Sequence, residues 1–356
     1  MIRTTKRYIP TLDGWRAIAI TLVMLFHLEL LRGYGLSTSW FYSNGGSGVE
    51  VFFAISGLLI CTLLLDEERN TGTISLGGFY FRRAFRILPA AVTYLCVVAL
   101  LRALGTITSL QVPEWIASLG FYRSFLPHAR TGWYTNHFWS LSVEEHFYLI
   151  LPLFLVVCKR HRGLILGVVG LLTLSSGFLL SHFRLVPGWA EGLSDFRLGS
   201  LFLSAGFAAS MLDHAVVKRL AGKATAPFLA LAAAFAAVTF VHDRIAAVVI
   251  PFLVLAAVAC TVMNPTNLLG KILENGVLRF IGKRSYSLYL WQQLFLSVHF
   301  GPGKEMVLQQ WPLSLLCTFG CACLSYSFVE QPLIRKGRAI LRKRSERRDE
   351  SLVAAS

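Results

Sequence analysis

Charged side chains are scarce in this sequence. Asp, Glu, Lys and Arg make up 15% of its 356 residues, whereas ordinary soluble proteins contain roughly 25%. Hydrophobic residues make up 55%, and the mean hydropathy is +0.59. A soluble domain of this length would need a charged surface that this chain does not supply. The composition therefore predicts a protein whose surface faces a lipid bilayer.

The patterns of several common functional sites are also missing. All seven cysteines fall in apolar runs, so the sequence predicts no disulfide framework. The nine histidines lack the spacing of metal ligands, and we expect no metal site. No G-x-S-x-G motif occurs, and no basic face with interleaved aromatic residues indicates nucleic acid as a partner. Any chemistry must therefore come from polar residues within the apolar segments.

Ten apolar runs are long enough to cross a bilayer. They lie near 15–31, 49–65, 85–104, 141–158, 163–181, 196–213, 226–242, 244–264, 285–300 and 312–331. An eleventh segment, 113–126, is shortened by Pro113, Glu114 and Arg123. We predict an all-α fold, a polytopic transmembrane helical bundle of about ten spans in the cell membrane, with both termini cytoplasmic.

The net charge of +15 supports this topology, because Lys and Arg are confined to short segments between the apolar runs. If 113–126 does not cross, the basic clusters fall on the cytoplasmic side, as the positive-inside rule requires. We predict one transmembrane domain over residues 1–334. A basic cytoplasmic tail over 335–356 is expected to be partly disordered and to contact anionic membrane lipid.

Two ionisable residues of the first run share one face. Arg16 and His27 are eleven residues apart, about three helical turns, which places them roughly 16 Å apart along the axis. Asp13 can reach Arg16 from the same side. This arrangement suits an elongated ligand with an anionic head and a reactive far end, such as acyl-CoA. Alternatively, Arg16 anchors the helix at the membrane surface, and His27 hydrogen-bonds a neighbouring helix.

A histidine is chemically suited to acyl transfer. Neutral imidazole can take a proton from an attacking hydroxyl, or it can itself be acylated. The sequence leaves both roles open for His27. Arg82, Arg83 and Arg86 precede the third run, and their guanidinium groups could bind the phosphates of CoA. Alternatively, these three arginines serve only to fix the topology.

Carboxylates occur at the predicted outer ends of two runs. Ser142 followed by Glu145 matches a capping box, which predicts a structural role for Glu145. Glu144 is then the freer carboxylate of its helix, and Glu50 begins the second run at the same outer end. Either Glu144 or Glu50 could orient the imidazole or bind an acceptor hydroxyl.

Six segments, in order, resemble the acyltransferase 3 family of integral membrane O-acyltransferases, and the resemblance runs from about residue 8 to 335. These segments read YIPTLDGWRAIAITLVMLFH at 8–27, GVEVFFAISGLLI at 48–60, FYFRRAFRILPA at 79–90, WSLSVEEHFYLILP at 139–152, SYSLYLW at 285–291 and SYSFVEQPL at 325–333.

The resemblance implies transfer of an acyl group, commonly acetyl, from cytoplasmic acyl-CoA to a hydroxyl of a cell-surface carbohydrate or lipid-linked glycan. The donor is then a substrate, and no permanently bound cofactor is expected. The resemblance also implies that His27 is the base and that Arg16 is its partner in the donor site. It strengthens the assignments of Arg82, Arg83 and Glu144, and it makes residues 1–334 an acyltransferase domain.

Two positions depart from the family pattern. Gln292 stands where many members have a histidine, so the chemistry should depend more on His27. Arg197 is followed two residues later by Gly199 in place of the usual aspartate, and Asp195 is a candidate replacement. Two other function classes stay open: a transporter or flippase of a glycan or lipid, and a membrane scaffold that depends on a partner.

Overall fold

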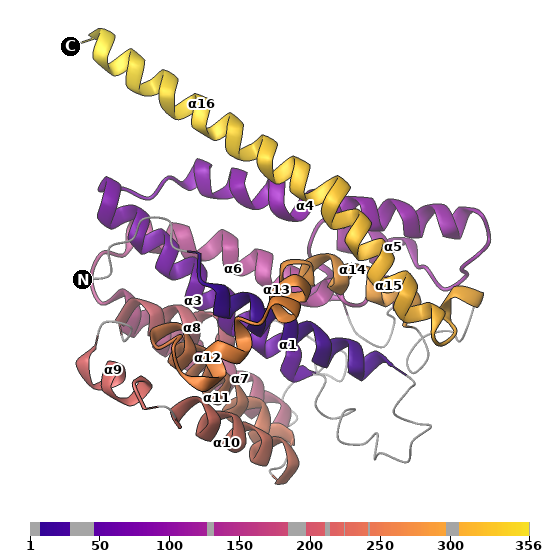
Figure 1. Ribbon diagram of the computed structural model, residues 1–356, viewed down its shortest axis with the longest axis horizontal. Coiled ribbons are helices and arrows are strands. Elements are labelled where there is room, and N and C mark those ends of the chain that lie inside the picture. Colours follow the sequence, from indigo (N-terminus) through magenta and orange to yellow (C-terminus); the bar gives the residue numbers. More distant parts are fainter. Residues whose placement is uncertain are drawn as a thin grey trace.

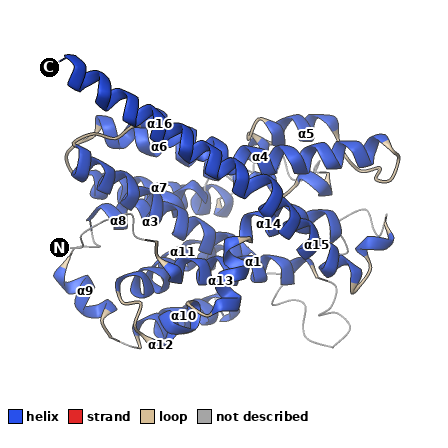
Figure 2. Ribbon diagram, turned by 45° about the horizontal axis from the view of Figure 1, so that its top comes forward, coloured by secondary structure: helices blue, strands red, loops and turns tan. Residues whose placement is uncertain are grey.

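The computed structural model describes residues 8–28, 46–126, 132–183, 197–210, 214–223, 225–240, 243–296 and 306–355, which fold into helices without a strand among them (Figures 1 and 2). The α-helices are α1 (Pro10–His27), α3 (Gly46–Thr71), α4 (Leu76–Ala103), α5 (Val112–Leu119), α6 (Phe138–Val157), α7 (Arg162–His182), α8 (Leu198–Ser210), α9 (Ala215–Ala221), α10 (Ala226–Phe240), α11 (Asp243–Met263), α12 (Leu268–Leu273), α13 (Gly276–Lys283), α14 (Ser285–Phe295), α15 (Leu313–Leu324) and α16 (Gln331–Ala355). Short 3₁₀ turns include η2 (Arg123–Phe125) and η4 (Trp133–Thr135), and a π-helical turn, η7 (Ser325–Glu330), joins α15 to α16.

The helices agree with the apolar runs of the sequence. Each of the ten runs overlaps a helix, and four helical segments are long and apolar enough to cross a membrane: Ser47–Thr71, Leu76–Ala103, Trp133–Val157 and Leu313–Arg344. Four shorter apolar helices are Arg162–Gly177, Leu198–Ser210, Ala226–Ala237 and Val248–Met263. The fold is therefore that of a helical membrane protein, while the count of ten spans and the side of the termini stay predictions.

The eleventh apolar segment of the sequence is too short to cross. Its helix, α5, has 8 residues, whereas a transmembrane helix needs about 20. Pro113 lies in its first turn, and Gly120 follows its last residue.

Helix α1 lies in the interior, where it packs against α3 and α13. Trp15 is buried, and its Nε1 donates a hydrogen bond to Thr261 Oγ1 of α11 at 2.7 Å. Glycines allow the neighbouring backbones to approach, since a Cβ on Gly14 would lie 2.2 Å from the carbonyl oxygen of Leu273. A Cβ on Gly282 would similarly meet the carbonyl of Asp13. This packing fixes the end of α1 that bears Asp13 and Arg16.

Helices α7 and α8 also pack through glycine. A Cβ on Gly199 would lie 2.6 Å from Leu174 Cγ and 2.7 Å from the carbonyl oxygen of Gly170. Small residues at such contacts are typical of membrane helix pairs. The family's usual aspartate would therefore not fit at position 199 in this chain. Asp195, the candidate replacement, lies outside the described residues.

Substituting Gly199 with alanine is expected to destabilise the protein by about 1–3 kcal/mol, the usual range for overpacking a close contact. Gly167→Ala on α7 is the matched control, because a Cβ there meets no atom within 4 Å. The measurement is the thermal midpoint of both variants in the same detergent. Equal midpoints for the two variants would contradict the close α7–α8 contact.

The basic tail forms a continuous helix. Helix α16 follows directly on η7 and packs against α4, and Figure 1 shows its C-terminal end extending beyond the other helices. The tail is rich in helix-forming Arg and Lys, and Arg342 Nε pairs with Glu346 one turn later at 2.9 Å. Partial disorder of residues 335–356 stays a prediction.

Candidate active site

The first polar group of the candidate site lies at the start of α1. Arg16 Nη1 is 3.4 Å from Asp13 Oδ1. The two residues are three positions apart, and they lie on one side of the helix as expected. Asp13 is buried, and it accepts a second hydrogen bond from the Tyr8 hydroxyl. The carboxylate therefore holds Arg16 in place while leaving the guanidinium donors on its other edge available.

Arg16 faces a narrow cavity of about 90 Å³ between α1, α3, α4, α6 and α14. Three guanidinium groups and two carboxylates line it, with hydroxyls between them. The polar lining residues are Arg16, Ser56, Arg83, Arg86, Ser140, Glu144, Glu145, Tyr148, Ser285, Tyr286 and Tyr289. The three guanidinium groups favour an anionic ligand.

Arg82 and Arg83 are neighbours in sequence but lie in different places. Arg83 lines the cavity, with its guanidinium carbon 4.9 Å from the centre of the Tyr148 ring. Arg82 points away from the cavity, and its Nη2 pairs with Glu67 at 3.0 Å. Successive helical residues point about 100° apart, which explains the separation. Of the three predicted phosphate-binding arginines, the cavity therefore brings together Arg83 and Arg86.

Glu144, one of the two carboxylates that could orient the imidazole or bind an acceptor hydroxyl, lines this cavity, whereas the Nδ1 partner of His27 is Gln292. It accepts hydrogen bonds from the Ser56 hydroxyl and from the Tyr148 hydroxyl, the latter at 2.8 Å. Glu145 lines the same cavity. Both carboxylates thus face the arginines and can balance their charge.

The predicted capping box at Ser142 and Glu145 is wrong. Helix α6 begins one turn earlier, at Phe138, because Phe138 packs in the buried core as part of the helix. Ser142 Oγ instead donates to the Phe138 carbonyl at 2.8 Å, and it accepts the backbone N–H of Arg123 at 3.1 Å. Glu145 is therefore a cavity residue and not a cap.

His27 occupies the other end of α1. Its Nδ1 is 2.9 Å from Oε1 of Gln292, and its ring meets the Trp133 ring edge-on at a centroid distance of 5.4 Å. An amide oxygen can only accept a hydrogen bond, so Nδ1 carries the proton. The lone pair of the neutral imidazole is then at Nε2, the nitrogen that can take a proton from a hydroxyl.

The partners of His27 are themselves held by hydrogen bonds. Gln292 is fully buried, and its neighbour Gln293 donates from Nε2 to the Trp133 carbonyl at 2.9 Å. Trp133 Nε1 in turn donates a hydrogen bond to the backbone carbonyl of Gln293 at 2.7 Å. Gln292, a departure from the family pattern, thus supplies the partner of the imidazole. Sequence analysis missed this role because nothing in the sequence links residues 27 and 292.

One face of α14 connects the cavity to His27. Ser285, Tyr289 and Gln292 occupy positions i, i+4 and i+7, which fall on one side of a helix. Ser285 and Tyr289 line the cavity, whereas Gln292 holds the imidazole. Seven residues rise by about 10 Å, so the cavity and His27 lie along one short path.

Gln292→Ala is expected to lower kcat for acyl transfer by about fivefold, with little change in KM for the donor. The imidazole would lose the bond that fixes its tautomer and its orientation, a net contribution of about 1 kcal/mol. The measurement is steady-state transfer by purified variants, compared with Gln292→Glu, which keeps an acceptor for Nδ1–H. A higher KM with unchanged kcat in Gln292→Ala would show that Gln292 serves donor binding instead.

A buried ion pair supports the turn that bears Trp133. Arg123 Nη2 lies 4.0 Å from Glu114 Oε1, and Glu114 also accepts the backbone N–H of Gly132. Burial raises the pKa of Glu114, and the positive charge of Arg123 opposes this rise. Breaking a buried pair leaves one charge without its partner. The pair therefore fastens η4 next to His27.

Two further side chains complete the surroundings. Glu50 lies 3.9 Å from Arg197 Nη1 and not against the imidazole, and the Arg197 guanidinium stacks on Trp139 at 4.9 Å. His137, which sequence analysis did not single out, is buried against Tyr289 at a ring distance of 5.5 Å. Within the described ranges, no group of three His, Cys, Asp or Glu side chains could hold a metal ion.

These features define a helical membrane protein with a histidine positioned for proton transfer beside a cationic cavity. The chain belongs to the acyltransferase 3 family, since the model described as "Acyltransferase domain" matches residues 9–330. It is 32% identical over 373 residues to "Putative O-acetyltransferase SACOL0978" of Staphylococcus aureus (strain COL), covering 93% of this chain and 58% of that protein.

A second relative carries a similar name. The chain is 32% identical over 375 residues to "O-acetyltransferase OatA" of Staphylococcus aureus (strain NCTC 8325 / PS 47), covering 94% of this chain and 58% of that protein. The chain thus spans less than two thirds of the length of these relatives. No solved structure matches the chain.

Proposed function

We propose that the protein is a membrane O-acyltransferase that moves an acetyl group from cytoplasmic acetyl-CoA to a hydroxyl of a cell-surface carbohydrate or lipid-linked glycan. One observation carries this proposal. The imidazole of His27 is hydrogen-bonded to Gln292 of α14, and the same helix lines the cavity that contains Arg16 and Arg83. The names of the relatives support acetyl as the transferred group. The donor binds as a substrate, and no resident cofactor is required.

The cavity accounts for donor binding. Guanidinium groups match phosphates in shape and charge, and Arg86 is exposed at the cavity, where the nucleotide end of CoA can reach it. The cavity, of about 90 Å³, is too small for a whole CoA molecule, so only part of the donor enters it. The nucleotide therefore stays at the mouth, and the thioester advances along α14 toward His27.

The proposed chemistry uses His27 as a general base. Nε2 takes the proton of the acceptor hydroxyl while the hydroxyl oxygen attacks the thioester carbonyl carbon. A C–O bond forms, the C–S bond breaks, and the imidazolium returns the proton to the departing CoA thiolate. The Nδ1–H bond to Gln292 keeps the imidazole in the required tautomer and steadies the imidazolium while it is charged.

The test is transfer of label from radiolabelled acetyl-CoA to extractable envelope glycans, in membranes with and without the protein. Label that depends on the protein and is released by mild alkali, which cleaves esters, supports the proposal. Movement of glycan across the membrane without acyl donor and without ester formation would instead establish the transporter interpretation.

A further inference from the structure

A second cavity, of about 400 Å³, lies where the end of α3 meets the beginning of α7 and the end of α8. It is much larger than the cavity beside Arg16. Its lining combines basic side chains with a few apolar ones: Leu65, Glu68, Arg69, Lys159, His161, Arg162, Gly163, Leu164, Ala209 and Ser210. None of the proposed catalytic residues belongs to it.

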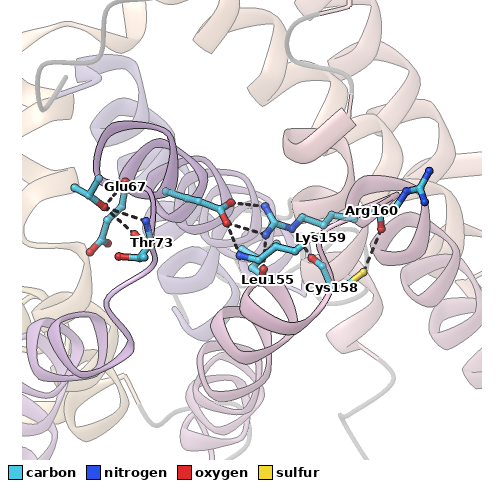
Figure 3. Close-up of polar contacts among 9 residues, drawn as sticks. Glu67, Thr73, Leu155, Cys158, Lys159 and Arg160 are labelled. Carbon is cyan, nitrogen blue, oxygen red and sulfur yellow. Dashed lines mark hydrogen bonds and ion pairs between the residues drawn. The ribbon is translucent and has the colours of Figure 1, made fainter.

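The charged groups of this cavity are arranged around Glu68. Lys159 Nζ lies 2.6 Å from Glu68 Oε1, and Arg162 Nη2 donates to the same oxygen at 3.0 Å and to the Leu155 carbonyl at 2.5 Å. Figure 3 shows Lys159 and Leu155 within this network. Arg69 adds a third cation, which also pairs with Asp66 at 3.5 Å. Three cations against one lining carboxylate leave the cavity positive, and Glu68 holds two of them in fixed positions.

Backbone groups add to the positive potential. Gly163 and Leu164 line the cavity in the first turn of α7, where N–H groups lack helical partners and the helix dipole is positive. His161 precedes this turn with φ of 53°, and its carbonyl accepts the N–H of Ile165 at 3.0 Å. The left-handed residue thus turns the chain so that α7 begins at the cavity. A phosphate would meet both side-chain and backbone donors there.

The cavity faces away from the proposed donor site. Helix α3 contributes side chains to both cavities, but from opposite faces. At 100° per residue, the mean direction of its side chains at the Arg16 cavity differs by roughly 170° from that of its side chains at the second cavity. The partner helices also differ, because α7 and α8 replace α1, α4 and α14. A CoA molecule bound beside Arg16 therefore does not account for the second cavity.

An exposed apolar stripe continues from the cavity along α7. Leu164, which lines the cavity, is 64% exposed, and Val168 and Leu172 follow at i+4 and i+8 with 47% and 62% exposure. In a membrane protein, such a stripe contacts acyl chains. Cations at one end and apolar side chains along the helix match the two parts of an amphiphile.

We propose that this cavity binds the headgroup of an anionic phospholipid. The phosphate lies among Lys159, Arg69 and the first turn of α7, and the acyl chains run along Leu164, Val168 and Leu172. The bound lipid joins the ends of α3, α7 and α8. This binding is independent of acyl transfer, so its test does not depend on the proposed function.

The test uses the purified full chain in nanodiscs of phosphatidylcholine alone or mixed with phosphatidylglycerol, with lipid retention read by native mass spectrometry. The variant is Arg69→Ala combined with Lys159→Ala, and both side chains are more than half exposed. Arg102→Ala combined with Lys271→Ala removes the same charge from exposed positions elsewhere. Thermal midpoints report stabilisation by lipid.

We expect the wild type and the Arg102/Lys271 control to retain phosphatidylglycerol and to gain thermal stability from it. The Arg69/Lys159 variant should bind about 25-fold more weakly, because each of the two basic groups near a lipid headgroup contributes about a factor of five. Equal retention by both double variants would overturn the proposal. Equal stabilisation by inorganic pyrophosphate in phosphatidylcholine would overturn it in favour of a soluble polyphosphate.

Discussion

Replacing His27 with alanine should lower kcat for acetyl transfer by about a hundredfold or more, because a general base contributes 10²–10⁴-fold. KM for acetyl-CoA should change little, since His27 is not among the residues that line the Arg16 cavity. Steady-state transfer by purified protein, at saturating acetyl-CoA and with a defined glycan acceptor, measures the effect.

His214→Ala is the control for this experiment. His214 is exposed and precedes α9, away from the residues assembled around Gln292. The His214→Ala variant should transfer acetyl at the wild-type rate, and both the His27→Ala and the His214→Ala variants should keep the wild-type thermal midpoint. A His27→Ala protein that is folded and within a few-fold of the wild-type kcat would remove His27 from the mechanism.

The adjacent arginines of α4 give the second large effect. Arg83→Ala should raise KM for acetyl-CoA by roughly tenfold or more, because a hydrogen bond to a charged group contributes about 1.5–3 kcal/mol. Arg82→Ala should leave KM close to the wild-type value. Its guanidinium is 45% exposed and pairs with Glu67, and exposed pairs contribute about 0–1 kcal/mol.

The comparison is decisive because both variants lose one charge from the same turn of one helix. A KM series for acetyl-CoA at two ionic strengths would measure it, with dephospho-CoA as a competitor to locate the contacted phosphate. An equal rise in KM for both variants would show that the arginines act through overall charge. A larger effect of Arg82→Ala would place the donor outside the cavity.

The sequence allowed most of the fold to be predicted. Apolar runs located the helices because lipid-facing and buried segments are apolar along their whole length. Pro113 and Gly120 explain why α5 stays short. The start of α6 was missed, because burial of Phe138 extends the helix beyond the capping pattern at Ser142.

The candidate site could be predicted only where it depends on local spacing. Asp13 and Arg16 pair across one helical turn, as their separation of three residues requires. By contrast, the division of Arg82 from Arg83 depends on how α4 is rotated against its neighbours. The contact of His27 with Gln292 joins α1 to α14 across 265 residues, so it follows from tertiary packing alone.

Glu144 shows the same limitation. Its place on α6 suggested the outer end of a span, but the structure places it in the cavity lined by Arg16, Arg83 and Arg86, where it accepts a hydrogen bond from Tyr148 one turn later. At Gly199 the reason is close packing: α7 approaches α8 so closely that a side chain at this position would not fit. The departure at this position therefore reflects packing between two helices.

The central claim is that this chain passes an acetyl group from CoA on one side of the membrane to a hydroxyl supplied on the other. The most direct measurement uses proteoliposomes with labelled acetyl-CoA on the side of the Arg16 cavity and a glycan acceptor enclosed on the opposite side. We predict alkali-labile label on the enclosed glycan with the wild type and none with His27→Ala. Label on the glycan only when donor and acceptor share one side, or equal label with both proteins, would contradict the account.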